Sequence, residues 1–200
     1  YIQPADLTQA LARGARNLGA EIMRYTTVLG IERVPGGEWL VRTDKGDIEA
    51  TTVVVACGVW SPRIARMAGA SIPLSPAVHQ MISVGPLPQF ADTVGEIVFP
   101  IVRDMDTNMY ERQHGNGLEI GSYAHRAILH DPEELPSVEE AQLSPTEFPF
   151  TSEDFELQYE QALELMPEIV GDETVGQKYA INGLLSLTPD GMPLLGETPE

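Results

Sequence analysis

Residues 51–61 read Thr-Thr-Val-Val-Val-Ala-Cys-Gly-Val-Trp-Ser, and this stretch decides the fold. The segment 51–58 begins as an unbroken β-branched run, which is typical of a strand buried on both faces of a parallel sheet. It ends in Ala56, Cys57 and Gly58, whose small side chains let the backbone approach a bound group closely. Because open α/β sheets bind ligands at the carboxyl ends of their strands, we expect a ligand at this tip.

Trp60 follows the tip by two residues, where its indole would form a wall against a flat aromatic cofactor. The alternative is a tight strand-to-helix turn in which Trp60 is simply buried. Ser61 and Pro62 then predict the start of a helix that ends near Gly69. No Gly-x-Gly-x-x-Gly loop occurs in the 200 residues, so a dinucleotide site is incomplete within this chain.

The residues before this stretch predict one helix and four strands. Apolar residues at helical spacing over 5–18, followed by Gly19, indicate an amphipathic helix, and a short strand is expected at 21–25. The period then changes to two, with turn residues at 35–37 and 44–46. The pattern predicts a three-stranded antiparallel meander over 28–34, 39–43 and 47–50.

The residues after it predict longer strands joined by Pro-rich segments and one further helix. Turn residues at 114–117 indicate a hairpin, 131–149 is expected to be an acidic loop, and 188–191 a turn. Thr151 or Ser152 is expected to cap a helix that continues to Met166. The strands are expected at 78–84, 97–102, 109–113, 118–123 and 175–187.

Charge is distributed unevenly along the chain. The formal net charge is −18, yet residues 1–70 carry eight bases and seven acids, whereas 71–200 carry four bases and 23 acids. This shift places a candidate domain boundary near 69–73. The acidic half is expected to be a solvated surface, or else a docking surface for a basic partner. So much acid argues against nucleic acid as a partner, and no run approaches the roughly 20 apolar residues of a membrane span.

The cysteine and histidine patterns exclude further classes of site. A single thiol, Cys57, cannot form an internal disulfide, so we expect a reducing compartment, either cytoplasmic or like the mitochondrial matrix. His125 and His130 are five residues apart, which places them on no common face, so no metal site is expected.

The order of these motifs resembles the FAD-dependent amine oxidoreductases of the D-amino-acid-oxidase-like superfamily, in their dimethylglycine/sarcosine dehydrogenase branch. The resemblance covers nearly the whole chain. Its motifs lie at 39–41, 53–61, 73–76, 79–80, 103–104, 110 and 187–193.

The resemblance implies an α/β plus α+β fold. Residues 1–70 would be part of a GR2-type FAD-binding domain that lacks its N-terminal phosphate loop. Residues 71–187 would form an antiparallel-sheet substrate domain, and 188–200 would return toward the FAD-binding domain. We expect the chain to be the central part of a longer protein and to be inactive alone.

The resemblance also assigns cofactor residues. It puts Val28 beside the adenine end of FAD and Trp60 against the flavin, next to the tip at Ala56, Cys57 and Gly58. For Val28 the alternative is ordinary strand packing, because strands commonly begin with Val.

His79 and Tyr110 are the candidate catalytic residues. Oxidation of an N-methyl amine requires the free amine lone pair, and a neutral His or a Tyr close to the amine favours the unprotonated form or takes its proton. The alternative is that both are structural residues of their strands. Arg103 or Arg126 is a candidate for pairing with a substrate carboxylate, with internal salt bridging as the alternative.

The implied function is FAD-dependent oxidation of a small N-methylated amino acid, of the dimethylglycine or sarcosine type, through an iminium to the demethylated product. Tetrahydrofolate would enter only through a domain outside these residues, and oxygen or an electron-transfer protein would accept the electrons. The alternatives are a related amino-acid or glycine oxidase, and a non-catalytic acidic binding module on a flavoprotein scaffold.

Overall fold

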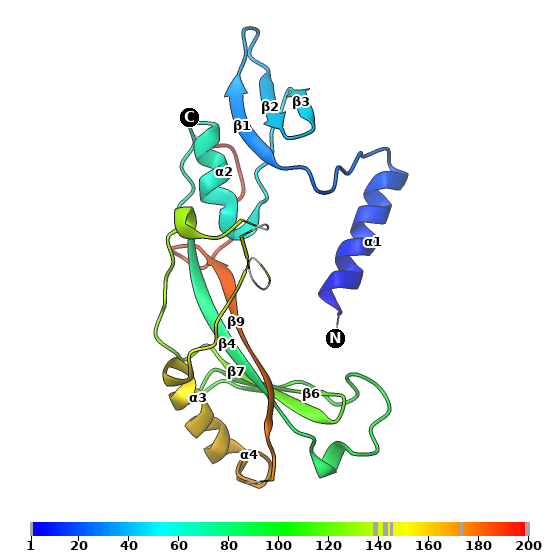
Figure 1. The fold of residues 1–200 in the computed structure, drawn as a ribbon, viewed down its shortest axis with the longest axis vertical. Helices are drawn as coiled ribbons and strands as arrows, with labels where there is room; N and C mark the ends of the chain where they lie inside the picture. The colour runs from blue at the N-terminus through cyan, green and yellow to red at the C-terminus, as the bar shows by residue number, and fades with distance from the viewer. Residues whose placement is uncertain (1, 138–139, 142–143, 145, 173, 199–200) are drawn as a thin grey trace. The chain divides into compact units, whose positions relative to one another are not determined.

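The computed structural model describes residues 2–137, 140–141, 144, 146–172 and 174–198 (Figure 1). The chain divides into two units, one of Tyr1–Ala56, Ile64–Ser71 and Thr198–Glu200 and one of Cys57–Arg63 and Ile72–Glu197. Its helices are α1 (Pro4–Asn17), α2 (Ser61–Met67), α3 (Ser152–Leu165) and α4 (Pro167–Val170), with 3-10 turns at η1 (Gly58–Trp60), η2 (Pro88–Phe90) and η3 (Pro132–Glu134). Its strands are β1 (Val28–Arg33), β2 (Trp39–Thr43), β3 (Gly46–Ala50), β4 (Ser75–Val84), β5 (Val102–Asp104), β6 (Met109–His114), β7 (Gly117–Ser122), β8 (Glu147–Phe148) and β9 (Gln177–Leu187).

The first unit contains the helix and the meander that the sequence predicts. In α1 the Gln3 side chain caps the first turn, and Pro4 stands where its missing N–H costs nothing. Strands β1, β2 and β3 pair in order and antiparallel, with Val41 between Ile31 and Ile48. Both predictions are confirmed.

Two strands predicted in this part of the chain are wrong. Residues 51–58, expected as a buried parallel strand, form none, and Val54 is 81% exposed. Residues 21–25, expected as a short strand, also form none. The physical reason is the same for both: a strand is stable only when it pairs with a neighbouring strand, and no described strand pairs with either segment.

The second unit is built on one antiparallel sheet. Its described strands pair in the order β5-β6-β7-β4-β9-β8, which confirms an antiparallel sheet in this half of the chain. The strand predicted at 97–102 is mostly wrong, because only Val102 of that range lies in β5. Val98 donates its N–H to the Gln113 side chain at 2.8 Å rather than to a strand. The predicted loop at 131–149 contains the short strand β8; its residues 138–139, 142–143 and 145 lie outside the described part.

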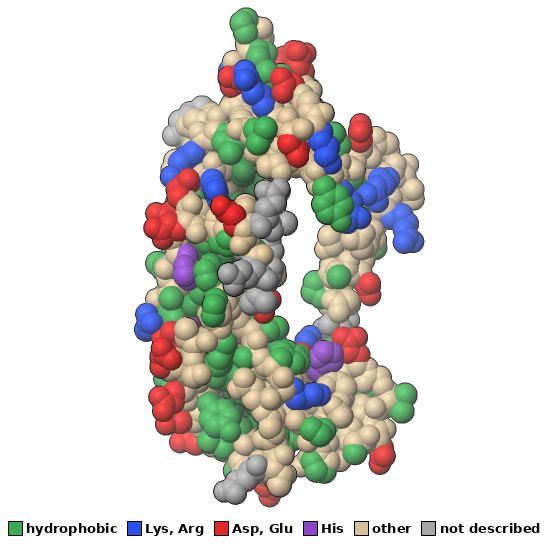
Figure 2. All heavy atoms as spheres, in the orientation of Figure 1, with side chains coloured by type: hydrophobic (Ala, Val, Ile, Leu, Met, Phe, Trp, Pro, Cys, Tyr) green, Lys and Arg blue, Asp and Glu red, His purple; other side chains and the backbone are tan. Residues whose placement is uncertain are grey.

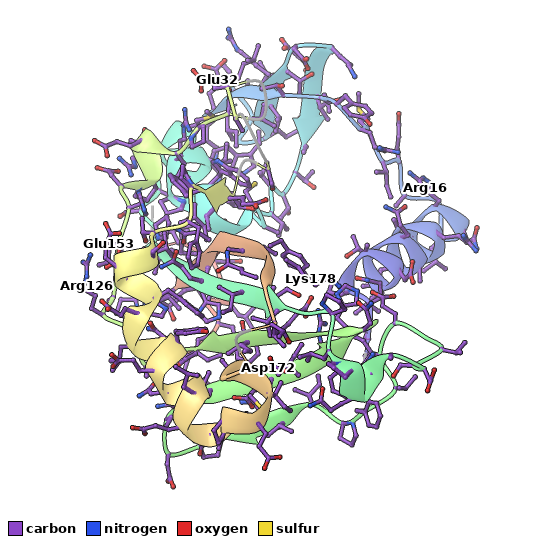
Figure 3. The ribbon with its side chains drawn as sticks, turned by 60° about the horizontal axis from the view of Figure 1, so that its bottom comes forward. Arg16, Glu32, Arg126, Glu153, Asp172 and Lys178 are labelled. Atoms are coloured by element: carbon purple, nitrogen blue, oxygen red, sulfur yellow. The ribbon has the colours of Figure 1, made fainter. Side chains whose placement is uncertain are left out.

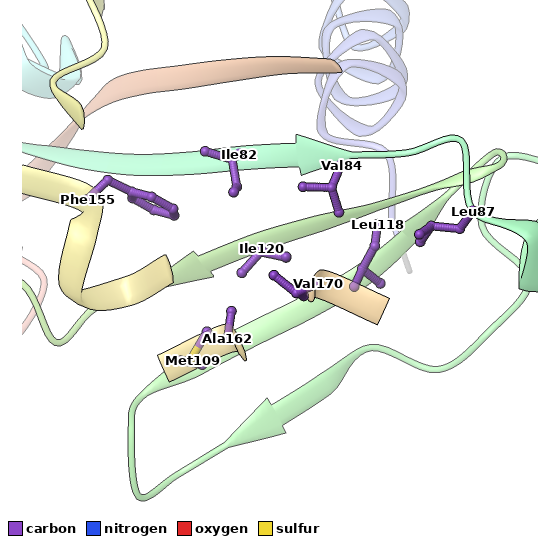
Figure 4. Packing of buried hydrophobic residues seen from close by; sticks show 9 residues of the cluster. All are labelled: Ile82, Val84, Leu87, Met109, Leu118, Ile120, Phe155, Ala162 and Val170. Carbon is purple, nitrogen blue, oxygen red and sulfur yellow. The ribbon is translucent and has the colours of Figure 1, made fainter. Parts of the chain in front are cut away.

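The two faces of this sheet differ in chemistry. Ile82 and Glu111 both pair with Ile120, so this cross-strand row lies on one face. Helices α3 and α4 contribute Phe155, Ala162 and Val170 to the same buried cluster (Figure 4). Burying each large apolar side chain contributes about 1.5–3 kcal/mol, so this face holds the unit together. The opposite face is free to carry polar side chains.

Acidic side chains gather around α3. Figure 2 shows acidic groups on the α3 side of this unit, and Figure 3 places Arg126 and Glu153 near the start of the helix. Arg126 donates to Asp154 at 2.8 Å in the first turn, where the helix dipole favours the carboxylate. No helix of the described residues has the length and apolar character needed to cross a membrane.

Candidate functional site

The sheet brings His79 and Tyr110 together on the face opposite α3. His79 lies on β4 and Tyr110 on β6, and their Nε2 and hydroxyl oxygen are 2.9 Å apart. Strand β7 separates β4 from β6, so the phenol reaches across it at Gly121. A Cβ on Gly121 would lie 2.3 Å from the Tyr110 hydroxyl oxygen, closer than any real contact. The absence of a side chain at Gly121 therefore makes the His79–Tyr110 pair possible.

Three more side chains complete the group. The Tyr123 ring stacks on His79 with centroids 4.3 Å apart and an interplanar angle of 10°. His125 Nε2 lies 3.4 Å from His79 Nδ1. The Arg103 guanidinium stands over Tyr123 at 5.6 Å, and no described acid forms an ion pair with it. We call His79, Tyr110, Tyr123 and His125 the aromatic cluster.

The environment keeps both members of the pair neutral. Burial, and secondly the charge of His125, lower the pKa of His79 to about 4. Burial, followed by Tyr123 and Glu119, raises the pKa of Tyr110. Near pH 7 the pair therefore holds a neutral imidazole and a protonated phenol, so neither group places a charge on this face of the sheet.

A separate ionic network occupies the same face farther along β6 and β7. Arg112 and His114 donate to the buried carboxylate of Glu119, and the Tyr179 hydroxyl also donates to it. Burial opposes ionisation, but these donors outweigh it and lower the pKa of Glu119. The Glu119 carboxylate is paired with donors from its own network, so we assign this network a structural role beside the aromatic cluster.

The small-residue tip is open. Ala56, Cys57 and Gly58 are all exposed, and the Cys57 N–H donates to Ser61 Oγ at 3.1 Å. Gly58 has φ +56°, and a Cβ there would meet only Ser186 Oγ, at 3.9 Å. Trp60 is half-buried. Exposed small residues beside an indole leave space for a flat ring, so the residues present fit a flavin.

Within the second unit, β9 connects the tip to the aromatic cluster. Gly58 approaches Ser186, whereas His79 pairs with Gly183 on the same strand. Three residues of strand separate these positions by about 10 Å. The two contacts therefore place Gly58 and His79 along the same strand, three strand residues apart.

Val28 belongs to the first unit. It begins β1, is half-buried, and is followed by an irregularity in the pairing with β2. A groove along the same strand is lined by Leu29, Gly30, Ile31, Glu32, Arg42 and Met67.

Histidines form no metal centre in the described part of the chain, where no three His, Cys, Asp or Glu residues converge. His130 packs its ring against Phe148, with centroids 4.6 Å apart. His125 instead joins the aromatic cluster. Tyr123, His125 and Gly121 were not predicted as site residues. The one signal in the sequence was the strand alternation at 119–123, which places residues 119, 121 and 123 on the same face of the sheet.

Comparison with known proteins extends these observations. The family model described as "FAD dependent oxidoreductase" matches residues 1–200. The chain is 29% identical over 204 residues to mitochondrial dimethylglycine dehydrogenase of Mus musculus, covering 98% of this chain and 22% of that protein. It is 31% identical over 208 residues to mitochondrial sarcosine dehydrogenase of Homo sapiens, covering 100% of this chain and 21% of that protein.

Solved structures show the same fold. The crystal structure of glycine oxidase from Geobacillus kaustophilus superimposes with a TM-score of 0.66 and 25% identity. That match covers 98% of this chain and 45% of the glycine oxidase chain. The chain thus spans about a fifth of the length of the curated relatives it matches.

Proposed function

The chain belongs to the family of FAD dependent oxidoreductases, and we propose that the protein containing it oxidises the N-methyl group of a small amino acid such as dimethylglycine or sarcosine. The names of the mouse and human relatives support this substrate class. The observation that carries the proposal is the neutral His79–Tyr110 pair, held at 2.9 Å on the polar face of the sheet.

The pair would act on the proton of the substrate amine. A protonated amine has no lone pair to assist loss of hydride from the N-methyl carbon, so the reactive form is the free amine. His79 is neutral over the whole range above its pKa of about 4, and burial keeps the Tyr110 phenol protonated by raising its pKa. Because neither side chain carries a negative charge that would hold the amine protonated, the pair favours the free amine.

The remaining residues would orient the substrate and the cofactor. FAD, when bound, supplies the acceptor for the hydride. Ala56, Cys57, Gly58 and Trp60 would hold the flavin ring, and Val28 the adenine end. Arg103 of β5 has no acidic partner among the described residues and would pair with the substrate carboxylate.

The other partners follow from the same proposal. Oxygen or an electron-transfer protein would receive the electrons, and tetrahydrofolate would bind only to a domain outside this chain. The mitochondrial relatives support a matrix-like compartment, and the single cysteine, Cys57, is free.

The test is anaerobic mixing of the full-length protein with sarcosine, dimethylglycine or glycine while flavin absorbance is followed. We expect bleaching by sarcosine or dimethylglycine, with formaldehyde released as water hydrolyses the iminium; oxygen or another acceptor then reoxidises the flavin. No bleaching by either amine would refute the substrate assignment.

The structural match to glycine oxidase favours a second candidate, oxidation of glycine or a related amino acid. The same experiment separates the two, because this candidate predicts bleaching by glycine without formaldehyde. A purified full-length protein that binds no FAD would instead support the acidic binding module.

A further inference from the structure

His125 extends the His79–Tyr110 pair into a longer hydrogen-bonded chain. Its Nε2 lies 3.4 Å from His79 Nδ1, and its Nδ1 lies 2.7 Å from the backbone carbonyl oxygen of Arg126. The chain thus runs from the Tyr110 hydroxyl through two imidazole rings to a backbone carbonyl. His125 is half-buried and lies in the segment after β7.

The Arg126 carbonyl at one end determines the donor and the acceptor in every hydrogen bond of this series. A carbonyl oxygen only accepts, so His125 donates from Nδ1. Its Nε2 faces His79 Nδ1 and, in the tautomer with this one ring proton, carries the lone pair. His79 must then donate from Nδ1 to His125. Its Nε2 is left as an acceptor, and the Tyr110 hydroxyl donates to it.

We propose that His125 is a positioning residue for amine oxidation: it fixes the tautomer of His79, so that Tyr110 points its hydrogen at His79 and away from the lone pair of the substrate amine. The inference rests on the proposed function and deepens it. With the other His79 tautomer, Nε2–H would donate to Tyr110, and the phenol hydrogen would turn toward the substrate. A donor facing the amine would compete with hydride loss by hydrogen-bonding the lone pair that assists it.

The electrostatic surroundings suit this role. Charged and titratable groups from three elements or segments lie around the cluster: Arg103 of β5, Arg126 in the segment after β7, and Asp154 of α3. Asp154 is held by the Arg126 side chain, while the Arg126 carbonyl accepts from His125. The backbone oxygen of Arg126, rather than a carboxylate, therefore accepts from His125 Nδ1.

The test uses the full-length flavoprotein and two substitutions with opposite hydrogen-bonding capacity. His125→Leu removes the acceptor for His79 Nδ1, whereas His125→Gln keeps an acceptor in its amide oxygen. Stopped-flow measurement gives the limiting rate of flavin reduction by the active amine as a function of pH. His130→Leu is the matched control, because His130 contacts Phe148 and lies outside the aromatic cluster.

We expect His125→Leu to lower the limiting rate at pH 7 by about tenfold or more, and to move the acid limb of the profile about one pH unit upward. We expect His125→Gln to stay within about threefold of the wild type with its acid limb unmoved. His130→Leu should follow the wild-type profile. If the Leu variant loses its flavin, His125→Ala provides the same comparison.

Two results would overturn the inference while leaving the proposed function intact. One is a His125→Leu profile that superimposes on that of the wild type. The other is an equal loss in the Leu and Gln variants at every pH, which is the signature of a merely structural role. A wild-type flavin that no amine reduces would instead refute the proposed function, and this inference with it.

Discussion

At the scale of single residues, the site depends on one missing side chain. Tyr110 reaches His79 only because Gly121 leaves the surface of β7 bare beneath the phenol. Gly183 lies on the other side of β4, opposite His79, yet a Cβ there would meet nothing closer than 3.9 Å. A methyl group at Gly121 would therefore collide with Tyr110, whereas one at Gly183 would be accommodated.

Gly121→Ala is expected to displace Tyr110 and separate it from His79. Overpacking of this kind costs about 1–3 kcal/mol of stability, and loss of the hydrogen bond between Tyr110 and His79 should slow flavin reduction by about tenfold or more. Thermal melting and stopped-flow absorbance measure the two effects. Gly183→Ala is the control and should keep both properties close to wild type. Equal behaviour of the two variants would show that Tyr110 does not need Gly121.

Trp60→Ala is expected to weaken flavin retention, because it removes the wall beside the small-residue tip. The measurement is the flavin-to-protein absorbance ratio after dialysis, with an expected loss of about half or more of the flavin if one aromatic contact of about 0.5–1.5 kcal/mol is lost. Trp39→Ala is the matched control, since Trp39 is also half-buried but packs under Arg33 in the first unit. Unchanged occupancy in the Trp60 variant would remove Trp60 from the cofactor site.

Sequence reasoning identified His79 and Tyr110 separately but not their contact. Their distance depends on the order β6-β7-β4, which brings together residues 31 positions apart, and no spacing along the chain reveals that order. His125 was compared only with His130, and its true neighbour, His79, lies 46 residues away.

At the scale of elements, β6 has a polar, titratable side chain on each face of the sheet. Tyr110 faces the aromatic cluster, while Glu111, next in sequence, points to the helix-covered side and is 1% exposed. Neither carboxylate oxygen of Glu111 has a partner among the described residues. Burial, and secondly Asp104, raise the pKa of Glu111 to about 7.

This gives a pH dependence of stability with a definite sign. Because the folded-state pKa of Glu111 is raised from 4.5 to about 7, its contribution to stability is full below pH 4.5 and is lost as the pH rises through 7. Glu111→Gln should therefore reduce the fall in Tm between pH 6 and pH 8.5 by about 2 °C. The exposed Glu164→Gln is the control, and an unchanged fall in the Glu111 variant would contradict the argument.

Local patterns predicted elements well where the partner strands are close in sequence. The meander follows from turn residues such as Gly36 and Gly37, both at positive φ, between alternating runs. The segment 51–57 failed for the opposite reason. Its β-branched composition specifies a strand only when neighbours flank it on both sides, and no described strand does so.

At the scale of the whole molecule, the acidic residues around α3 and the aromatic cluster lie on different faces of the sheet of the second unit. Of the 30 acidic residues, 14 lie between 127 and 177, a range without Lys or Arg, and many surround α3 on the helix side of the sheet. The aromatic cluster occupies the other side. The acidic surface around α3 is therefore available for solubility or for docking.

The most direct test of the central claim is the limiting rate of anaerobic flavin reduction in Tyr110→Phe compared with the wild type, at a saturating concentration of the amine that bleaches the flavin. Phe keeps the ring over Gly121 but removes the hydroxyl that meets His79. The account predicts a fall of about a hundredfold, with the flavin content unchanged. A Tyr110→Phe variant that is reduced as fast as the wild type would contradict it.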